Sequence, residues 1–397
     1  MDTSRGALAA WPHPSALGRD AWLDLFQVVA DALRFSPPLY LFSVLGTPAS
    51  WLQPHRYSEY RIGDVWRLHR TVKYLLDATL PAIQKAPPPF GLPLVSGLVW
   101  RPTVVLQRPD HNGNYTTFPK EAWIFVNGIL TNDGVAHLNG ALIADLFHRP
   151  LTIVQNSTGA VWADLVECAM GKQARRVTES VEKAFPVIYD ALKSEKERVV
   201  VIAHSQGTII MSVVLRLLAE SLRAGGVATK TAGRGRRPRA IARYEPVVPH
   251  DWPIRLQDFE PVTRAEVAKL EVYCFANCAN TMTYVDDGAR GAAPIPWIES
   301  FGNEYDLVAR LGMLAPNPGQ CGIRIDGPRY IRRDAWGHLL NDHYLAAIED
   351  AQRAGHRRGG RGGASPYERL DRTVPVDAAP RLFGYINGGV PQGGASQ

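Results

Sequence analysis

The sequence predicts an α/β fold, a doubly wound and mostly parallel β-sheet with helices between its strands. Short apolar runs of strand length alternate with longer stretches in which apolar residues recur at helical spacing. The clearest strand is expected at residues 199–202 (VVVI), because a run of Val and Ile is typical of a strand buried on both faces of a parallel sheet. At 397 residues the chain is long enough for one large core with elaborations, or for two domains.

The N-terminal region is expected to be helical. Residues 20–34 and 62–80 carry apolar side chains at helical spacing, and several prolines separate the two stretches. The proline-rich run at residues 86–93 is expected to form a stiff boundary. We therefore predict that residues 1–88 form an α-helical N-terminal elaboration, packed either over the mouth of a site or on the far side of the sheet.

Strands and helices are then expected to alternate through residues 89–352 in one α/β domain. A helix is expected at residues 173–193, and another directly after residue 205. The expected strands lie at residues 98–106, 123–126, 151–154, 199–202, 270–275 and 297–301. The last stretch, residues 353–397, is rich in glycine and poor in apolar residues, which predicts a disordered tail with residues 382–386 as a docking point.

The composition is that of an ordinary soluble globular protein, with 46% hydrophobic and 21% charged residues. The net charge is +6, yet residues 223–243 alone contain seven Lys or Arg and no acidic residue. That segment lacks interleaved aromatic residues, which argues against a nucleic-acid partner. We expect a mobile basic insertion there, with peripheral contact with an anionic membrane as the alternative.

The sequence favours a cytoplasmic protein. Its first 20 residues lack the apolar core of a secretory signal peptide, and no run approaches the roughly 18 apolar residues that a membrane span requires. The four cysteines show no paired metal-ligand spacing, and Cys274 and Cys278 are expected to be buried thiols rather than parts of a disulfide framework. No metal or organic cofactor is implied, and the oligomeric state stays open.

Ser205 is the strongest candidate for a functional residue. It lies in the sequence AHSQG, between the expected strand at 199–202 and an amphipathic helix. The small residues Ala203 and Gly207 let strand and helix approach closely, and the sharp turn predicts a strained backbone at Ser205. A hydroxyl group at the positive end of a helix suits a nucleophile that must become an oxyanion. A capping role in another α/β fold is the alternative.

This strand–Ser–helix context resembles the α/β-hydrolase superfamily, in particular its esterase and lipase-like members. The first position of the usual G-x-S-x-G motif is Ala203 in this chain. In the hydrolase order, an acid follows a later strand and a histidine lies nearer the C-terminus. The resemblance implies a catalytic domain at residues 89–352.

The resemblance also implies the acid and the base. Asp306 follows the expected strand at 297–301 and precedes an apolar pair, with Glu304 as the alternative acid. His338 follows Gly337 at the start of the last helical pattern, with His343 as the alternative base. His204, next to the nucleophile, is expected to support the turn rather than to act as the base.

An oxyanion hole requires donors aimed at the developing charge. The backbone amide of Gln206, the residue after the nucleophile, is expected to be one donor. The second is expected from Gly128 or Ile129, in the turn after the strand at 123–126. A simple hairpin turn at Asn127 and Gly128 is the alternative, although a long helical stretch follows it.

The expected function is therefore that of a serine hydrolase. Such an enzyme would cleave a carboxylic ester, of a small molecule or a lipid, through an acyl-enzyme intermediate. A thioesterase or acyltransferase would use the same three residues. A membrane-peripheral phospholipase would also fit the pattern, and so would a hydrolase-fold interaction protein that has lost its chemistry.

Overall fold

The structure is a computed structural model of the chain. It describes residues 46–47, 57–59, 104–108, 120–128, 131, 133–155, 179–232, 256–285, 293–316, 318–319, 322–357, 365–370 and 379–391. The two helices expected at residues 20–34 and 62–80 lie outside the described residues, as do the proline-rich boundary, Ile129, Cys168 and Cys321.

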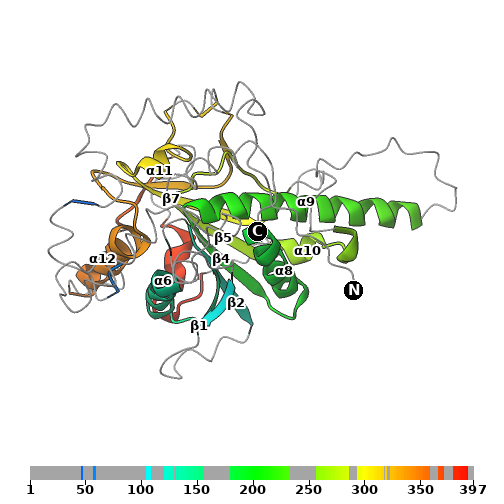
Figure 1. Ribbon diagram of the computed structural model, residues 1–397, viewed down its shortest axis with the longest axis horizontal. Coiled ribbons are helices and arrows are strands. Elements are labelled where there is room, and N and C mark those ends of the chain that lie inside the picture. The colour runs from blue at the N-terminus through cyan, green and yellow to red at the C-terminus, as the bar shows by residue number, and fades with distance from the viewer. Residues whose placement is uncertain are drawn as a thin grey trace, which may run out of the picture.

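A mostly parallel β-sheet forms the centre of the described structure (Figure 1). Within the described residues its order is β1-β3-β2-β4-β5-β7-β9-β10. The pairs from β3 to β9 are parallel, and β1 and β10 pair antiparallel at the two edges. The strands are β1 Val104–Arg108, β2 Glu121–Val126, β3 Leu151–Gln155, β4 Arg198–His204, β5 Leu270–Phe275, β7 Trp297–Asn303, β9 Arg329–Arg332 and β10 Glu368–Arg369. The prediction of an α/β fold with a mostly parallel sheet is confirmed.

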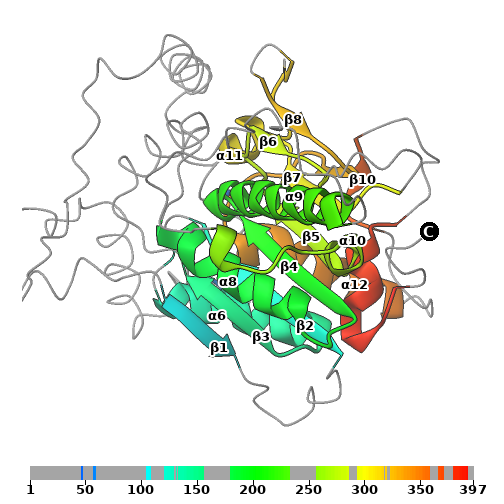
Figure 2. The same cartoon turned by 90° about the vertical axis from the view of Figure 1, so that its right-hand side faces the viewer.

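Helices cover both faces of the sheet (Figure 2). One face packs against α8 Glu179–Lys193, α9 Gln206–Ala232 and α10 Arg264–Ala268. The other face packs against α6 Asp133–Phe147, the π-helix η5 Leu340–Leu345, α12 Ala346–Arg357 and the 3₁₀-helix η6 Arg381–Gly388. The remaining elements are η4 Leu256–Asp258, α11 Leu307–Arg310 and a two-stranded sheet of β6 Thr281–Met282 with β8 Arg324–Ile325.

The central strand β4 shows why the run of Val and Ile predicts its position. Val199 and Val201 pack into the core on the α9 face, whereas Val200 and Ile202 pack into the core on the α6 face. Both faces of β4 are buried, so polar and apolar residues do not alternate along the strand. The carboxyl ends of the parallel strands therefore meet at one edge of the sheet, and Ser205 follows β4 at that edge.

The prediction of a basic loop at residues 223–243 is wrong for its first part. Helix α9 continues to Ala232, so residues 223–232 are helical (Figure 1). Gly225 lies where a Cβ atom would be 3.0 Å from the Cβ of Pro261, so a small residue is needed at this contact. A glycine inside a helix costs about 1 kcal/mol of helix stability relative to alanine, and a long helix packed on the sheet tolerates this cost. Residues 233–243 lie outside the described residues.

The prediction of a disordered tail at residues 353–397 is also wrong for much of its length. Helix α12 extends to Arg357, and β10 pairs with β9. In η6, Leu382 and Tyr385 are fully buried, so the docking point expected at residues 382–386 is confirmed. The low average content of apolar residues in this segment therefore does not predict that Leu382 and Tyr385 pack into the core.

Polar contacts also hold the C-terminal segment, at the amino end of the sheet. Arg381 forms an ion pair of 2.9 Å with the buried Glu271 of β5. The carboxylate of Glu299, buried on β7, accepts hydrogen bonds from the backbone amides of Arg381 and Leu382 at 2.8 and 3.2 Å. The C-terminal segment is thus part of the α/β domain. Among the described helices, none has the length and apolar character needed to cross a bilayer.

Candidate active site

Ser205 occupies the turn between β4 and α9, as the sequence predicts. Its φ is +56°, a left-handed conformation that costs a residue with a Cβ on the order of 1–3 kcal/mol. The backbone amide of Ser205 donates to the carbonyl of Phe275 at 3.0 Å. Gly207 packs against the end of β2, where a Cβ atom would be only 2.2 Å from the carbonyl oxygen of Val126. The strained turn and the need for a small residue at position 207 are confirmed.

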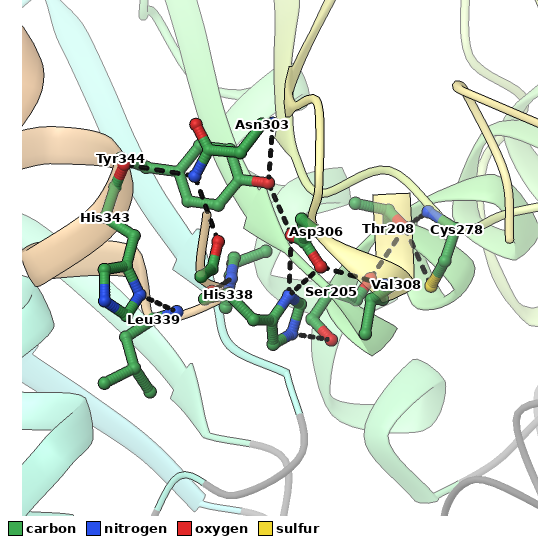
Figure 3. A network of polar contacts seen from close by, with 12 residues as sticks. Ser205, Thr208, Cys278, Asn303, Asp306, Val308, His338, Leu339, His343 and Tyr344 are labelled. Atoms are coloured by element: carbon green, nitrogen blue, oxygen red, sulfur yellow. Dashed lines mark hydrogen bonds and ion pairs between the residues drawn. The ribbon is translucent and has the colours of Figure 1, made fainter. Parts of the chain in front are cut away.

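His338 connects Ser205 to Asp306 (Figure 3). Its Nε2 lies 2.9 Å from the Oγ of Ser205. Its Nδ1 lies 2.9 Å from Oδ2 and 3.1 Å from Oδ1 of Asp306. All three side chains are buried. Three residues from distant parts of the chain therefore form one continuous hydrogen-bonded path.

Asp306 is held from two further directions. It precedes α11 and caps it, since its Oδ1 accepts from the backbone amide of Val308 at 2.8 Å. The hydroxyl of Tyr344 donates to its Oδ2 at 2.5 Å. Burial and the nearby charge of Asp306 raise the pKa of Tyr344 well above its usual range, so the phenol keeps its proton and acts as a donor. The acid is fixed in the orientation that a histidine partner requires.

The alternative acid, Glu304, lies outside this path. Its carboxylate accepts from Arg333 at 3.2 Å and from the backbone amide of Asp334 at 2.9 Å. It caps a turn on the surface, and no contact with His338 is seen for it among the described interactions. Asp306 is therefore the acid that the structure brings to the candidate base.

The alternative base, His343, supports the loop that carries His338. Its Nδ1 accepts from the backbone amide of Leu339 at 2.9 Å. Burial, together with the charge of His338, lowers the pKa of His343 to about 3, so its ring is neutral at physiological pH. Gly337 packs on this ring with φ +94°, and a Cβ atom there would be 2.4 Å from Nδ1 of His343. The glycine before His338 thus has a steric cause.

His204 contributes a second supporting imidazole. Its Nε2 donates to the backbone carbonyl of His338 at 2.9 Å, and the two rings pack at a tilt of 31° with their centroids 4.7 Å apart. Burial and the neighbouring His338 lower the pKa of His204 well below its usual range, so it stays neutral. Its contacts support the loop of the candidate base, and the expected support of the turn at Ser205 stays a prediction.

The expected oxyanion residues lie beside Ser205. Gln206 is the first residue of α9 and directly follows the serine. Gly128 follows β2, and a Cβ atom on it would be 2.5 Å from Cβ and 3.1 Å from Oγ of Ser205. Only glycine lets the backbone come this close. A helix, α6, follows this turn, so the hairpin alternative is wrong. Ile129 lies outside the described residues.

Sequence reasoning missed two residues that shape this site. Tyr344 looks like an apolar position of a helix, and only the π-helical turn of η5 brings its hydroxyl to Asp306. Asn303, at the end of β7, donates to the carbonyls of Gly337 and His343 at 3.0 and 3.2 Å. Asn303 could have been found from the sequence, because it is a polar residue at the end of a buried strand. Tyr344 offers no such signal.

Comparisons with protein-family models, with curated proteins and with solved structures find no match for this chain. Among the described residues, no group of three or more His, Cys, Asp or Glu side chains is arranged to hold a metal ion. Cys274 and Cys278 are buried, as expected, and burial raises the pKa of the Cys274 thiol beyond the physiological range.

Proposed function

We propose that this chain is a serine hydrolase of the α/β-hydrolase type that cleaves carboxylic esters. The observation that carries the proposal is the path from Ser205 through His338 to Asp306, with both imidazole nitrogens at 2.9 Å from their partners. The path begins at a serine held at positive φ on the N-terminus of a 27-residue helix. That combination of strain, helix end and base is what an activated nucleophile needs.

Each residue has a distinct role in the proposed reaction. His338 removes the proton from Oγ of Ser205 as the oxygen attacks the ester carbonyl, and later gives this proton to the leaving alcohol. Asp306 holds the Nδ1–H tautomer of His338 and stabilises the imidazolium ion. Water then attacks the acyl-enzyme with His338 again acting as the base, which releases the acid and restores Ser205.

Negative charge on the carbonyl oxygen would be stabilised by backbone donors. The amide of Gln206, in the first turn of α9, is one candidate donor, and the turn at Gly128 supplies the other wall. The packing of Gly128 against Oγ of Ser205 supports this assignment, because the oxyanion forms next to the attacking oxygen. The positive end of the α9 dipole favours the same charge.

A fluorophosphonate probe tests the proposal directly, since it reacts with an activated serine and leaves a mass label. Wild-type protein is expected to be labelled at Ser205, and Ser205→Ala is expected to lose both label and ester hydrolysis. The matched control is Ser212→Ala, on the same helix, whose hydroxyl donates only to the carbonyl of Ile209 in the described contacts. Unlabelled wild-type protein that is folded and hydrolyses no ester in a chain-length panel would refute the proposal.

A further inference from the structure

Residues 57–59 pack against the loop of the candidate base, although they lie about 280 positions before it. They occupy the space between helix α6 and the π-helix η5, which begins two residues after His338. Ser58 and Glu59 are buried there. The hydroxyl of Tyr57 donates to Asp145 of α6. We call residues 57–59 the strap.

The strap and η5 cap each other. Oε2 of Glu59 accepts from the backbone amide of Asn341 at 3.0 Å, and the amide of Asp342 also donates to this carboxylate. In return, Oδ2 of Asp342 accepts from the backbone amide of Glu59 and from the hydroxyl of Ser58, both at 2.9 Å. This reciprocal arrangement is that of a capping box, formed here between distant segments. Leu339, the residue that precedes η5, makes no side-chain cap of its own.

Asn139 of α6 ties the two segments together. Its side-chain amide donates to Oε1 of Glu59 and, at 3.0 Å, to Oδ1 of Asn341. The side-chain amide of Asn341 donates in turn to the carbonyls of Tyr57 and Leu138 at 2.8 and 3.0 Å. The start of η5 is thus fixed by the strap and by α6, and Glu59 accepts hydrogen bonds from both α6 and η5.

We infer that Glu59 is a positioning residue for His338, acting through the start of η5. The inference rests on the proposed function, because it concerns how the base is held for Ser205. Without the Glu59 carboxylate, the amides of Asn341 and Asp342 lose a buried acceptor, so the start of η5 must shift or admit water. His338 lies just before this turn, and a displacement of about 1 Å at a catalytic group can cost roughly 100-fold in rate.

Burial of Glu59 has an energetic cost. Burial and the charge of Asp342 raise the pKa of Glu59 to about 8. An acid whose pKa is raised in the folded state reduces stability as the pH rises from its unfolded value toward the folded one. Holding this acid inside the protein therefore lowers stability at neutral pH, as it does for Glu299, and it is the contacts with the start of η5 that distinguish Glu59 as a positioning residue.

The test compares full-length variants of two buried carboxylates. Glu59→Ala removes the cap of η5, and Glu299→Ala removes the acceptor at the start of η6, at the opposite end of the sheet. For a hydrolysed ester, Glu59→Ala is expected to lower kcat about 10- to 100-fold with KM changed by less than about 3-fold. Glu299→Ala is expected to lower the melting temperature while kcat stays within about 3-fold of wild type.

Two milder variants keep the test informative if Glu59→Ala does not fold. Glu59→Gln retains one acceptor oxygen and is expected to recover part of the lost kcat. Ser58→Ala removes one hydrogen bond to Asp342 and is expected to lower kcat less than Glu59→Ala. Hydrogen exchange of residues 338–345 is expected to be faster in both strap variants and unchanged in Glu299→Ala.

The outcomes separate the strap from the proposed function. Unchanged kcat and unchanged exchange at 338–345 in Glu59→Ala would overturn the inference while leaving the hydrolase intact. An equal loss of kcat in Glu299→Ala would do the same, because it would reduce the effect to general stability. A wild-type protein without any esterase activity or probe labelling would refute the proposed function, and the exchange comparison alone would then decide whether Glu59 holds the loop of His338.

Discussion

Asp306→Asn isolates the contribution of the acid, because the structure indicates how an asparagine would sit. The two carboxylate oxygens serve partly different donors. Oδ1 accepts from the amide of Val308 and lies 3.1 Å from Nδ1 of His338, whereas Oδ2 accepts from Tyr344 and lies closer to Nδ1, at 2.9 Å. Asparagine has one acceptor oxygen. The cap of α11 requires that oxygen at the Oδ1 position, which places the NH₂ group opposite His338.

An NH₂ group facing Nδ1 reverses the imidazole tautomer. Nδ1 must then accept, so Nε2 carries the proton and points it at Oγ of Ser205, 2.9 Å away. His338 in this tautomer cannot remove the serine proton. The expected loss in kcat is about 10⁴-fold, or about 5 kcal/mol of transition-state stabilisation. The cap to Val308 is retained, but the buried hydroxyl of Tyr344 loses its acceptor, so a loss of about 1–3 kcal/mol of stability is expected without loss of the fold.

The assay is steady-state ester hydrolysis together with the rate of fluorophosphonate labelling. Both are expected to fall by a similar factor, because both need a deprotonated Ser205. The matched control is Glu304→Gln, which alters the acid two residues away that contacts Arg333 instead of His338. A kcat of Asp306→Asn within about 10-fold of wild type, in folded protein, would refute the proposed role of this acid.

Three further predictions follow from the same structure. His338→Ala is expected to match the kcat loss of Ser205→Ala in steady-state kinetics. His343→Ala removes the acceptor for the Leu339 amide, so it is expected to lower stability and to reduce kcat by a smaller factor; the reverse pattern would exchange the roles of the two histidines. Gly207→Ala is expected to destabilise the protein by about 1–3 kcal/mol in urea unfolding and to lower kcat, whereas Gly319→Ala, where a Cβ atom meets nothing within 4 Å, is expected to do neither. Because burial raises the pKa of Glu299 from 4.5 to about 7, the folded protein keeps a proton that the unfolded chain loses, so Glu299 is expected to contribute a fall of roughly 3 kcal/mol to the free energy of unfolding between pH 4.5 and pH 7. The fall measured over this range is expected to be smaller in Glu299→Gln, and equal slopes would refute this.

The turn at Ser205 was predictable because its signals are local. A strand buried on both faces, a small residue at position 207 and an amphipathic helix all lie within a short stretch of sequence, and each has one steric reason. The choice of His338 over His343 was also predictable from the preceding Gly337, whose positive φ now has a cause in the ring packed against it. The choice of Asp306 over Glu304 came from the resemblance to the α/β-hydrolase order of residues.

The supporting contacts were not predictable, because they depend on distant packing. Nothing in the sequence around Glu59 or Asn341 shows that they meet, since 282 residues separate them. Tyr344 reaches Asp306 only through a π-helical turn, which departs from the 3.6-residue period used to interpret the sequence. Composition gave the wrong prediction for the C-terminal segment, because the burial of Leu382 and Tyr385 holds η6 in place despite the surrounding glycines.

The contact between η6 and the sheet has a consequence for protein engineering. A shortened protein ending at Arg353, which composition alone would recommend, would strip Glu271 of the Arg381 guanidinium and the Tyr385 hydroxyl, and Glu299 of two amides. It would also uncover the apolar face of the sheet beneath Leu382. Such a product would be prone to aggregation, with two carboxyl groups and an apolar surface exposed far from the chemistry. A fusion partner or affinity tag is therefore better added after residue 391 than used to replace the C-terminal segment that contains η6.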